Sequence, residues 1–284
     1  MHLPVPYSDT AFTLFGMDVK WYAIMIVTGI ILAVILGCKR APKYGFDTDT
    51  ILDLMLVVLP CAVIGARAYY VIFEWDRYAD NWLEIFNFRG GGLAIHGGLI
   101  AAFLAAWLMC RKKGLNIVKG LDMAAPSIAL GQAIGRWGNY FNQEAHGGPT
   151  DLPWGILIDG EYVHPTFLYE SLWCFLLVVV LILIARKQKF DGQIILLYGI
   201  LYSVERYFVE GLRTDSLWIG PFRQAQVLSV SLIIACTVVY IILEKRAAKA
   251  AAVAEAETLA DEAIAADGSA EMSAADSESA AEEN

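Results

Sequence analysis

Long apolar segments are the feature that most constrains how this chain can fold. A helix of about 20 apolar residues crosses the hydrocarbon core of a bilayer, and four runs of that length stand out, at about residues 19–38, 51–73, 166–185 and 224–243. Three weaker runs, at about 93–110, 121–141 and 193–209, are interrupted by Gly, Gln, Arg and Asn, as is typical of helices that line a polar cavity. With 57% hydrophobic and only 18% charged residues, the chain is unlike an ordinary soluble domain. The sequence predicts an all-α integral membrane protein with about seven transmembrane helices.

Basic residues predict the orientation of these helices. We expect the first apolar run to be a retained helix, because it is too long for a cleaved signal and has no basic region before it. Thirteen Lys and Arg residues then fall on one side of the membrane, which is therefore the inner side: Lys39, Arg40, Lys43, Arg111, Lys112, Lys113, Lys119, Arg186, Lys187, Lys189, Lys245, Arg246 and Lys249. The N-terminus is predicted outside and the C-terminus in the cytoplasm, with a small loop region on the outer side.

Charge divides the chain into two parts. Residues 247–284 hold ten Asp and Glu and one Lys, so the first 246 residues carry twenty charges of each sign. We predict a membrane domain over 1–246 and a disordered acidic Ala/Glu-rich tail over 247–284, because the tail has too few large apolar groups to offset the entropy of ordering. The neutral body has no clustered basic surface, which excludes nucleic acid as the main partner.

The cysteines do not indicate a metal site. The five are odd in number, form no CxxC pair and all lie in or beside apolar runs. We interpret them as small buried hydrophobic residues, and we expect neither a bound metal nor a cofactor.

The segment NFRGGGLAIHGGLI places a histidine, His96, close to the outer end of a weak apolar run. The glycines favour close helix packing, in which case the histidine is incidental. An ionisable side chain at membrane depth is costly and is usually functional, and histidine suits proton transfer near neutral pH. Both interpretations remain open on this segment alone.

Polar groups also gather where the fourth run ends, in GQAIGRWGNYFNQEAHGGPT. Arg136, Asn139, Asn142 and Glu144 occur within nine residues. A half-buried guanidinium beside two amides suits an anion such as phosphate, and we expect the nearby carboxylate to orient the arginine. The alternative is a snorkelling arginine at a polar helix end.

The sixth run continues into LYSVERYFVEGLRTD, which aligns charges along one helix. Tyr202, Arg206, Glu210 and Arg213 follow at i, i+4, i+8 and i+11 and form one stripe. The stripe is either an internal ladder in which Glu210 pairs with both arginines or a net positive surface that receives one anion. HPTFLYES adds His164, Tyr169 and Glu170 at the start of the fifth run, and Tyr22 lies at the start of the first, where an aromatic belt is the alternative.

In the predicted orientation all of these clusters lie in the outer half of the membrane. A cavity there that combines histidine, arginines and carboxylates and is open to lipid suits a phospholipid. Two other classes remain possible. A transporter or channel would also place charges inside a bundle, although no internal repeat is evident, and seven spans alone suggest a receptor.

The motifs themselves carry a resemblance to a known family. GRWGNYFNQE resembles the signature of the bacterial prolipoprotein diacylglyceryl transferases, and IHGGL, HPTFLYE, WYAIM, GARAYYVIF and the stripe from Tyr202 to Arg213 occur in the order that family shows. The resemblance covers roughly residues 10–245. It implies a seven-span enzyme of the bacterial cytoplasmic membrane that moves the diacylglyceryl group of phosphatidylglycerol to the lipobox cysteine of a prolipoprotein and releases glycerol phosphate, the first step of lipoprotein maturation.

The resemblance also implies roles for individual residues. It assigns catalysis to His96, Arg136, Arg206, Tyr22 and Tyr202. It assigns binding of the phosphatidylglycerol phosphate and headgroup to Arg136, Asn139, Asn142, Glu144, Gly147, Arg206, Glu210 and Arg213. It assigns supporting roles to Arg67, His164 and Glu170. The implied partners are phosphatidylglycerol, the lipobox segment of the prolipoprotein and membrane lipid. We take His96 as the general base or as a proton relay, oriented by Tyr22 or Tyr202. We take the two arginines as the phosphate ligands, and Glu144 and Glu210 as the groups that hold those arginines.

Overall fold

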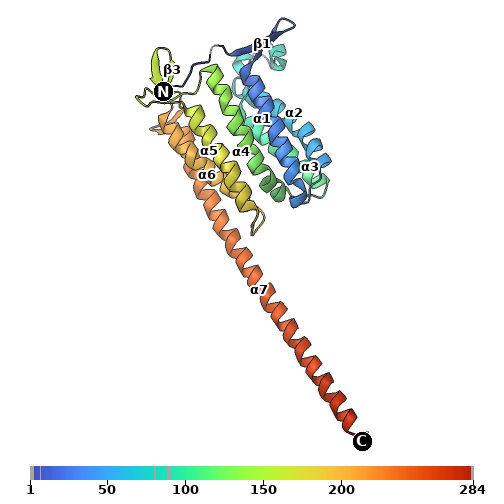
Figure 1. The fold of residues 1–284 in the computed structure, drawn as a ribbon. Coiled ribbons are helices and arrows are strands. Elements are labelled where there is room, and N and C mark those ends of the chain that lie inside the picture. Colours follow the sequence, from blue (N-terminus) through green and yellow to red (C-terminus); the bar gives the residue numbers. More distant parts are fainter. Residues whose placement is uncertain (1–2, 7, 80, 88–90, 283–284) are drawn as a thin grey trace. The chain divides into compact units, whose positions relative to one another are not determined.

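The computed structural model describes residues 3–6, 8–79, 81–87 and 91–282. Contacts divide the chain into two units, Met1–Cys236 and Thr237–Asn284, which are described separately. The first unit contains helices α1 (Trp21–Arg40), α2 (Thr48–Phe73), α3 (Ile95–Lys112), α4 (Ile117–Asn142), α5 (Thr166–Ala185), α6 (Gln193–Leu212) and the start of α7 (Gln224–Glu282). Figure 1 shows α1 to α6 running alongside one another. An all-helical architecture is confirmed.

Four helices are long and apolar enough to cross a membrane. They cover Trp21–Tyr44, Thr48–Phe73, Thr166–Ala185 and Gln224–Ala256, and they coincide with the four strong runs of the sequence. The three weaker runs form the helices α3, α4 and α6, whose polar residues keep them below that hydropathy. Four helices therefore have the length and apolar composition predicted for membrane spans, and the count of seven stays a prediction.

Short hairpins and 3₁₀ turns connect the helices. The strand pairs are β1 (Thr10–Leu14) with β2 (Met17–Lys20), β3 (Ile156–Ile158) with β4 (Glu161–Val163), and β5 (Trp218–Ile219) with β6 (Phe222–Arg223), all antiparallel. The 3₁₀ turns are η1 (Ala41–Tyr44), η2 (Trp75–Arg77) and η3 (Trp82–Phe86). The three hairpins adjoin the start of α1, the end of α4, the start of α5 and the end of α6, so we call this the hairpin end of the bundle.

Helix packing follows from small residues at the contacts. α1 packs on α4, α2 on α3, and α4, α5 and α6 pack on one another. Between α2 and α3, a Cβ on Gly65 would lie 2.7 Å from the carbonyl oxygen of Gly97, and a Cβ on Gly97 would lie 2.4 Å from that of Gly65. The Gly-rich segment around His96 thus serves close helix packing, one of the two interpretations left open above.

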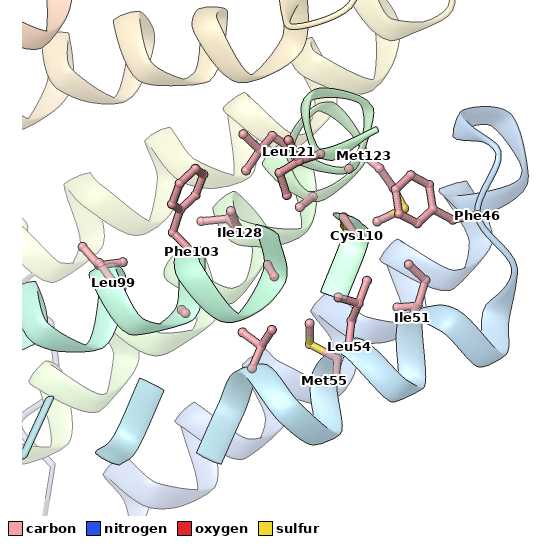
Figure 2. Close-up of a pocket in the computed structure, with 16 residues that line it drawn as sticks. Phe46, Ile51, Leu54, Met55, Leu99, Phe103, Cys110, Leu121, Met123 and Ile128 are labelled. Atoms are coloured by element: carbon pink, nitrogen blue, oxygen red, sulfur yellow. The ribbon is translucent and has the colours of Figure 1, made fainter. Parts of the chain in front are cut away.

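An apolar cavity of 430 Å³ lies among α2, α3 and α4, away from the hairpin end (Figure 2). Its walls include Phe46, Leu54, Phe103, Cys110 and Met123, and every side chain that lines it is apolar. Because it offers no polar group, it cannot be the site predicted from the polar motifs.

The acidic tail belongs to the last helix, because α7 extends over Gln224–Glu282. Ala and Glu, which are frequent in the tail, are among the best helix formers. The disorder expected over 247–284 stays a prediction.

A buried carboxylate fixes the other end of α6. Asp122 of α4 is 0% exposed and accepts hydrogen bonds from the backbone N–H groups of Gly192 (2.6 Å), Ile194 (2.9 Å) and Ile195 (2.9 Å). The side chain of Gln188 also donates to it, at 2.6 Å. Helix N-termini leave N–H groups without partners, and α6 has no cap of its own from Gly192. Asp122 therefore supplies the cap from a neighbouring helix.

We expect Asp122→Ala to lower the free energy of unfolding by about 3 kcal/mol, because it leaves several buried N–H groups without acceptors. Unfolding in mixed detergent micelles measures the loss. The matched control is Asp191→Ala, which removes an exposed carboxylate 3.9 Å from Lys119 and should change stability by less than about 0.5 kcal/mol. Equal effects of the two substitutions would contradict the capping role.

Candidate functional site

A chain of buried ion pairs lies at the hairpin end, among α4, α5 and α6. Glu170 of α5 is 2% exposed and pairs with two arginines: Arg136 of α4 through its Nε, and Arg206 of α6 at 3.3 Å. Arg206 also pairs with Glu210 one turn further along α6, at 2.6 Å. The expected pair of Arg206 with Glu210 is therefore present. We call Arg136, Glu170, Arg206 and Glu210 the ion-pair chain.

Tyrosines border the ion-pair chain on α6. The hydroxyl of Tyr202 accepts a hydrogen bond from Arg136 at 3.4 Å, and its ring stacks on Tyr198 with 5.6 Å between centroids. Tyr198 in turn donates to Gln132 of α4 at 2.9 Å. Tyr202 thus touches one of the two predicted phosphate ligands, as a residue that orients it would.

A second group of predicted residues lines an open cavity of 470 Å³. Its walls are Asp9, Lys20, Tyr22, Ala23, Asn142 and Glu144. One carboxylate oxygen of Glu144 accepts from the amides of Asn139 (3.0 Å) and Asn142 (3.2 Å). At the edge, Lys20 pairs with Asp9 at 2.7 Å and holds the pKa of that carboxyl below its usual range. The cavity brings together amide donors, a carboxylate and a phenol, which suits a polyhydroxyl headgroup.

Two predicted arginine partners are wrong. We expected Glu144 to hold Arg136, whereas Glu170 does so. One of the two interpretations of the stripe paired Glu210 with both Arg206 and Arg213, whereas Arg213 makes a two-pronged pair with Asp215, at 2.9 and 2.7 Å. The guanidinium holds the pKa of Asp215 below its usual range. Because that fork is already occupied, Arg213 is less free to bind an anion than the stripe suggested.

Gly147 lies where three segments meet. Its N–H donates to the carbonyl of His164 at 2.9 Å, and the next N–H, of Gly148, donates to the carbonyl of Leu212 at 3.0 Å. A Cβ at Gly147 would lie 2.6 Å from the Cβ of His164. The residue thus joins the loop after α4 to the start of α5 and the end of α6, which is a structural reason for a glycine at a position predicted to bind substrate.

Three other predicted residues lie apart from the ion-pair chain. His96, at the start of α3, is exposed, and the contact described for it is with the ring of Tyr69, at 6.3 Å between centroids. Arg67 is 5% exposed and donates to the backbone carbonyls of Glu84, Ile85, Gly91 and Gly92, so it holds the loop between α2 and α3. The ring of His164 contacts the hydroxyl of Tyr169, at 3.3 Å.

Comparison with known proteins identifies the family of this chain. The family model described as prolipoprotein diacylglyceryl transferase matches residues 9–242. The chain belongs to the prolipoprotein diacylglyceryl transferase family. A phosphatidylglycerol–prolipoprotein diacylglyceryl transferase of Finegoldia magna is 52% identical over 240 residues, which cover 84% of this chain and 97% of the relative. Those of Clostridioides difficile (50% identical, 83% and 95% covered) and Bacillus cereus strain Q1 (47%, 87% and 96%) are similar to it as well.

The match ends at residue 242, close to the predicted end of the membrane domain at 246. The acidic segment thus lies outside the family's common part. The family resemblance drawn from the motifs is confirmed.

Sequence reasoning missed two acidic residues of this site. Asp215 follows the stripe by two residues, and its proximity to Arg213 was the available signal. Glu205 lies beside Arg206 in LYSVERYF but off the i, i+4 stripe, and it is 6% exposed. A charged residue inside an apolar run was the signal that should have drawn attention to it.

The contact between Tyr22 and Gly138 allows a test of this geometry. A Cβ at Gly138 would lie 2.6 Å from the Tyr22 ring, whereas a Cβ at Gly135, one turn earlier, would lie 3.5 Å from Ile26. We expect Gly138→Ala to destabilise the protein by about 1–3 kcal/mol through overpacking. Gly135→Ala is the control and should be neutral or stabilising, because Ala favours helix over Gly. Unfolding in mixed micelles compares them, and stability unchanged in both would contradict the close packing of Tyr22.

Proposed function

We propose that this chain transfers the diacylglyceryl group of phosphatidylglycerol to the thiol of a lipobox cysteine. The products are a thioether on the prolipoprotein and glycerol phosphate. The single observation that carries the proposal is the match over 80% or more of the chain, at 47–52% identity, to transferases named for this substrate pair. The partly buried pair of arginines at the hairpin end adds independent chemical support.

The reaction needs three things from the protein: a sulfur nucleophile, an anchored phosphate and a stabilised leaving group. The S–H bond breaks, sulfur bonds to the glycerol carbon, and the bond between that carbon and the phosphate oxygen breaks. A free thiol has a pKa of about 8.5, so a proton acceptor increases the reactive thiolate. The thiol proton then resides on the base, and the negative charge resides on glycerol phosphate.

Candidate residues exist for each of these three requirements. Arg136 and Arg206 bind the phosphate and stabilise the charge that develops on its oxygen, with Glu170 and Glu210 holding their forks in place. The cavity lined by Tyr22, Asn142 and Glu144 receives the headgroup. His96 accepts the thiol proton, directly or through water. Tyr202 orients Arg136.

The same proposal includes a topology. Seven spans cross the cytoplasmic membrane, the hairpin end faces outward, and the C-terminus lies in the cytoplasm. The thirteen basic residues predicted inside support this orientation.

The decisive assay uses the purified full chain in liposomes that contain phosphatidylglycerol, with a peptide that bears a lipobox cysteine. Mass spectrometry should find a diacylglyceryl mass gain on the thiol, and the same peptide with serine in place of cysteine should show none. Absence of product with folded protein and lipid present would refute the proposal and favour a transport role for the buried charges.

Arg136→Lys tests whether the planar fork matters. Lysine keeps the charge but cannot hold Glu170 and a phosphate through two parallel donors, so we expect the turnover rate to fall by about a hundredfold. Arg77→Lys is the control, because Arg77 is a largely exposed arginine of the same end, paired with Glu74, and it should keep its activity. Full activity in Arg136→Lys would show that a point charge suffices.

His96→Gln tests the proton acceptor. We expect turnover to fall by about a hundredfold at neutral pH and to recover partly as pH rises toward the thiol pKa of about 8.5, because the thiolate then forms without a base. Rates measured from pH 6 to 9 with both proteins check this. Full turnover at neutral pH would remove His96 from the chemistry, and a loss that no pH relieves would assign it a structural role.

A further inference from the structure

Glu205 is a buried carboxylate without a partner. It lies on α6, it is 6% exposed, and in the part of the chain that the structure describes neither of its oxygens has a hydrogen-bond donor. A carboxylate buried away from water costs free energy unless it is paired or hydrogen-bonded. Glu170 and Glu210, by contrast, each face a guanidinium.

Charged and titratable groups of α4, α5 and α6 lie within electrostatic reach of Glu205. They are Arg136 of α4, Glu170 and Cys174 of α5, and Tyr202 and Arg206 of α6. Both guanidinium groups are already engaged. Arg136 binds Glu170 and Tyr202, and Arg206 binds Glu170 and Glu210. Glu205 therefore receives no ion pair, although two cations are near.

The charge of the site depends on this one residue. Arg136 and Arg206 carry two positive charges, and Glu170 and Glu210 carry two negative ones, so the ion-pair chain is neutral. An ionised Glu205 would make the cluster negative and would repel an anion. A protonated Glu205 leaves it neutral, and a phosphate can then compete with the carboxylates for the arginine forks.

We infer that Glu205 carries a proton in the resting protein and thereby keeps Arg136 and Arg206 available to an anionic phosphate. The inference rests on the proposed function, since it concerns the phosphate of phosphatidylglycerol. Glu205 is a positioning residue, because it acts through the charge that the arginines experience and not by contact with the reacting atoms.

Infrared spectroscopy tests the proton directly. The difference spectrum between the wild type and Glu205→Gln, recorded in H₂O and D₂O, should contain the band of a protonated, buried carboxylic acid that shifts on deuteration. Glu161→Gln, which changes an exposed carboxylate of β4, should show no such band. Absence of the band from the Glu205→Gln difference spectrum would overturn the inference.

Kinetics tests the consequence. The KM of the wild type for phosphatidylglycerol should rise about tenfold as pH increases and Glu205 ionises, because an unscreened charge enters beside the phosphate. Glu205→Gln mimics the protonated form, so its KM should stay within about twofold over the same range, whereas Glu161→Gln should follow the wild type. Superimposable KM profiles for wild type and Glu205→Gln would overturn the inference, and so would a loss of kcat alone.

The wild type alone decides the matter if Glu205→Gln does not fold. The acid band should then disappear over the same pH range in which KM rises. A spectrum without a protonated carboxyl at the pH of full activity would overturn the inference. Failure of the proposed function is distinguished from both, because the wild type would then form no thioether at any pH.

Discussion

The carboxylate of Glu170, held between two arginines from two other helices, is the interaction on which the rest of the site depends. Two partly buried guanidinium groups side by side would repel each other and would lose hydration. Glu170 neutralises both at once, and because it comes from α5 it fixes α4 and α6 relative to a common point. The ion-pair chain is thus as much a constraint on helix placement as a binding surface.

Neutrality has a chemical consequence for any anion that enters. A phosphate does not meet free cations there. It meets arginines whose forks are already occupied, so it gains only the difference between its own bonds and those of Glu170 or Glu210. An anion binds to such a site by replacing Glu170 or Glu210 at an arginine. Exchange limits how tightly a charged product is held, which suits an enzyme that has to release glycerol phosphate after each turnover.

The opposite end of the bundle uses the same device for a different purpose. At the start of α6, Asp122 of α4 caps the helix. At the hairpin end, Glu170 of α5 pairs with Arg206 of α6, so a buried carboxylate fixes α6 to a neighbouring helix at each end. Between them, Tyr198 of α6 donates a hydrogen bond to Gln132 of α4. Polar residues of α4 and α6 thus bind partners on neighbouring helices, as Arg136, Arg206 and Tyr198 do.

The sequence alone predicts the features that depend on residues close together in the chain. Run length predicted the four strong spans, and helical periodicity predicted the pair of Arg206 with Glu210, since residues four apart lie on one face. The sequence alone does not predict which side chains pair between different helices. Arg136 could meet Glu144, eight residues further along the chain, or Glu170, thirty-four residues away. Which of the two it meets depends on how α4 and α5 are rotated against each other, and periodicity within one helix carries no information about that rotation.

The distance between His96 and the ion-pair chain follows from the proposed reaction itself. The glycerol carbon that changes partners lies between the incoming sulfur and the departing phosphate oxygen, and these two atoms approach and leave on opposite sides of it. A base for the thiol and a cradle for the phosphate therefore belong on opposite sides of the substrate. A site in which His96 touched Arg136 would leave no room for the carbon between them, so the placement of these residues on two different helices, α3 and α4, is compatible with the proposed displacement.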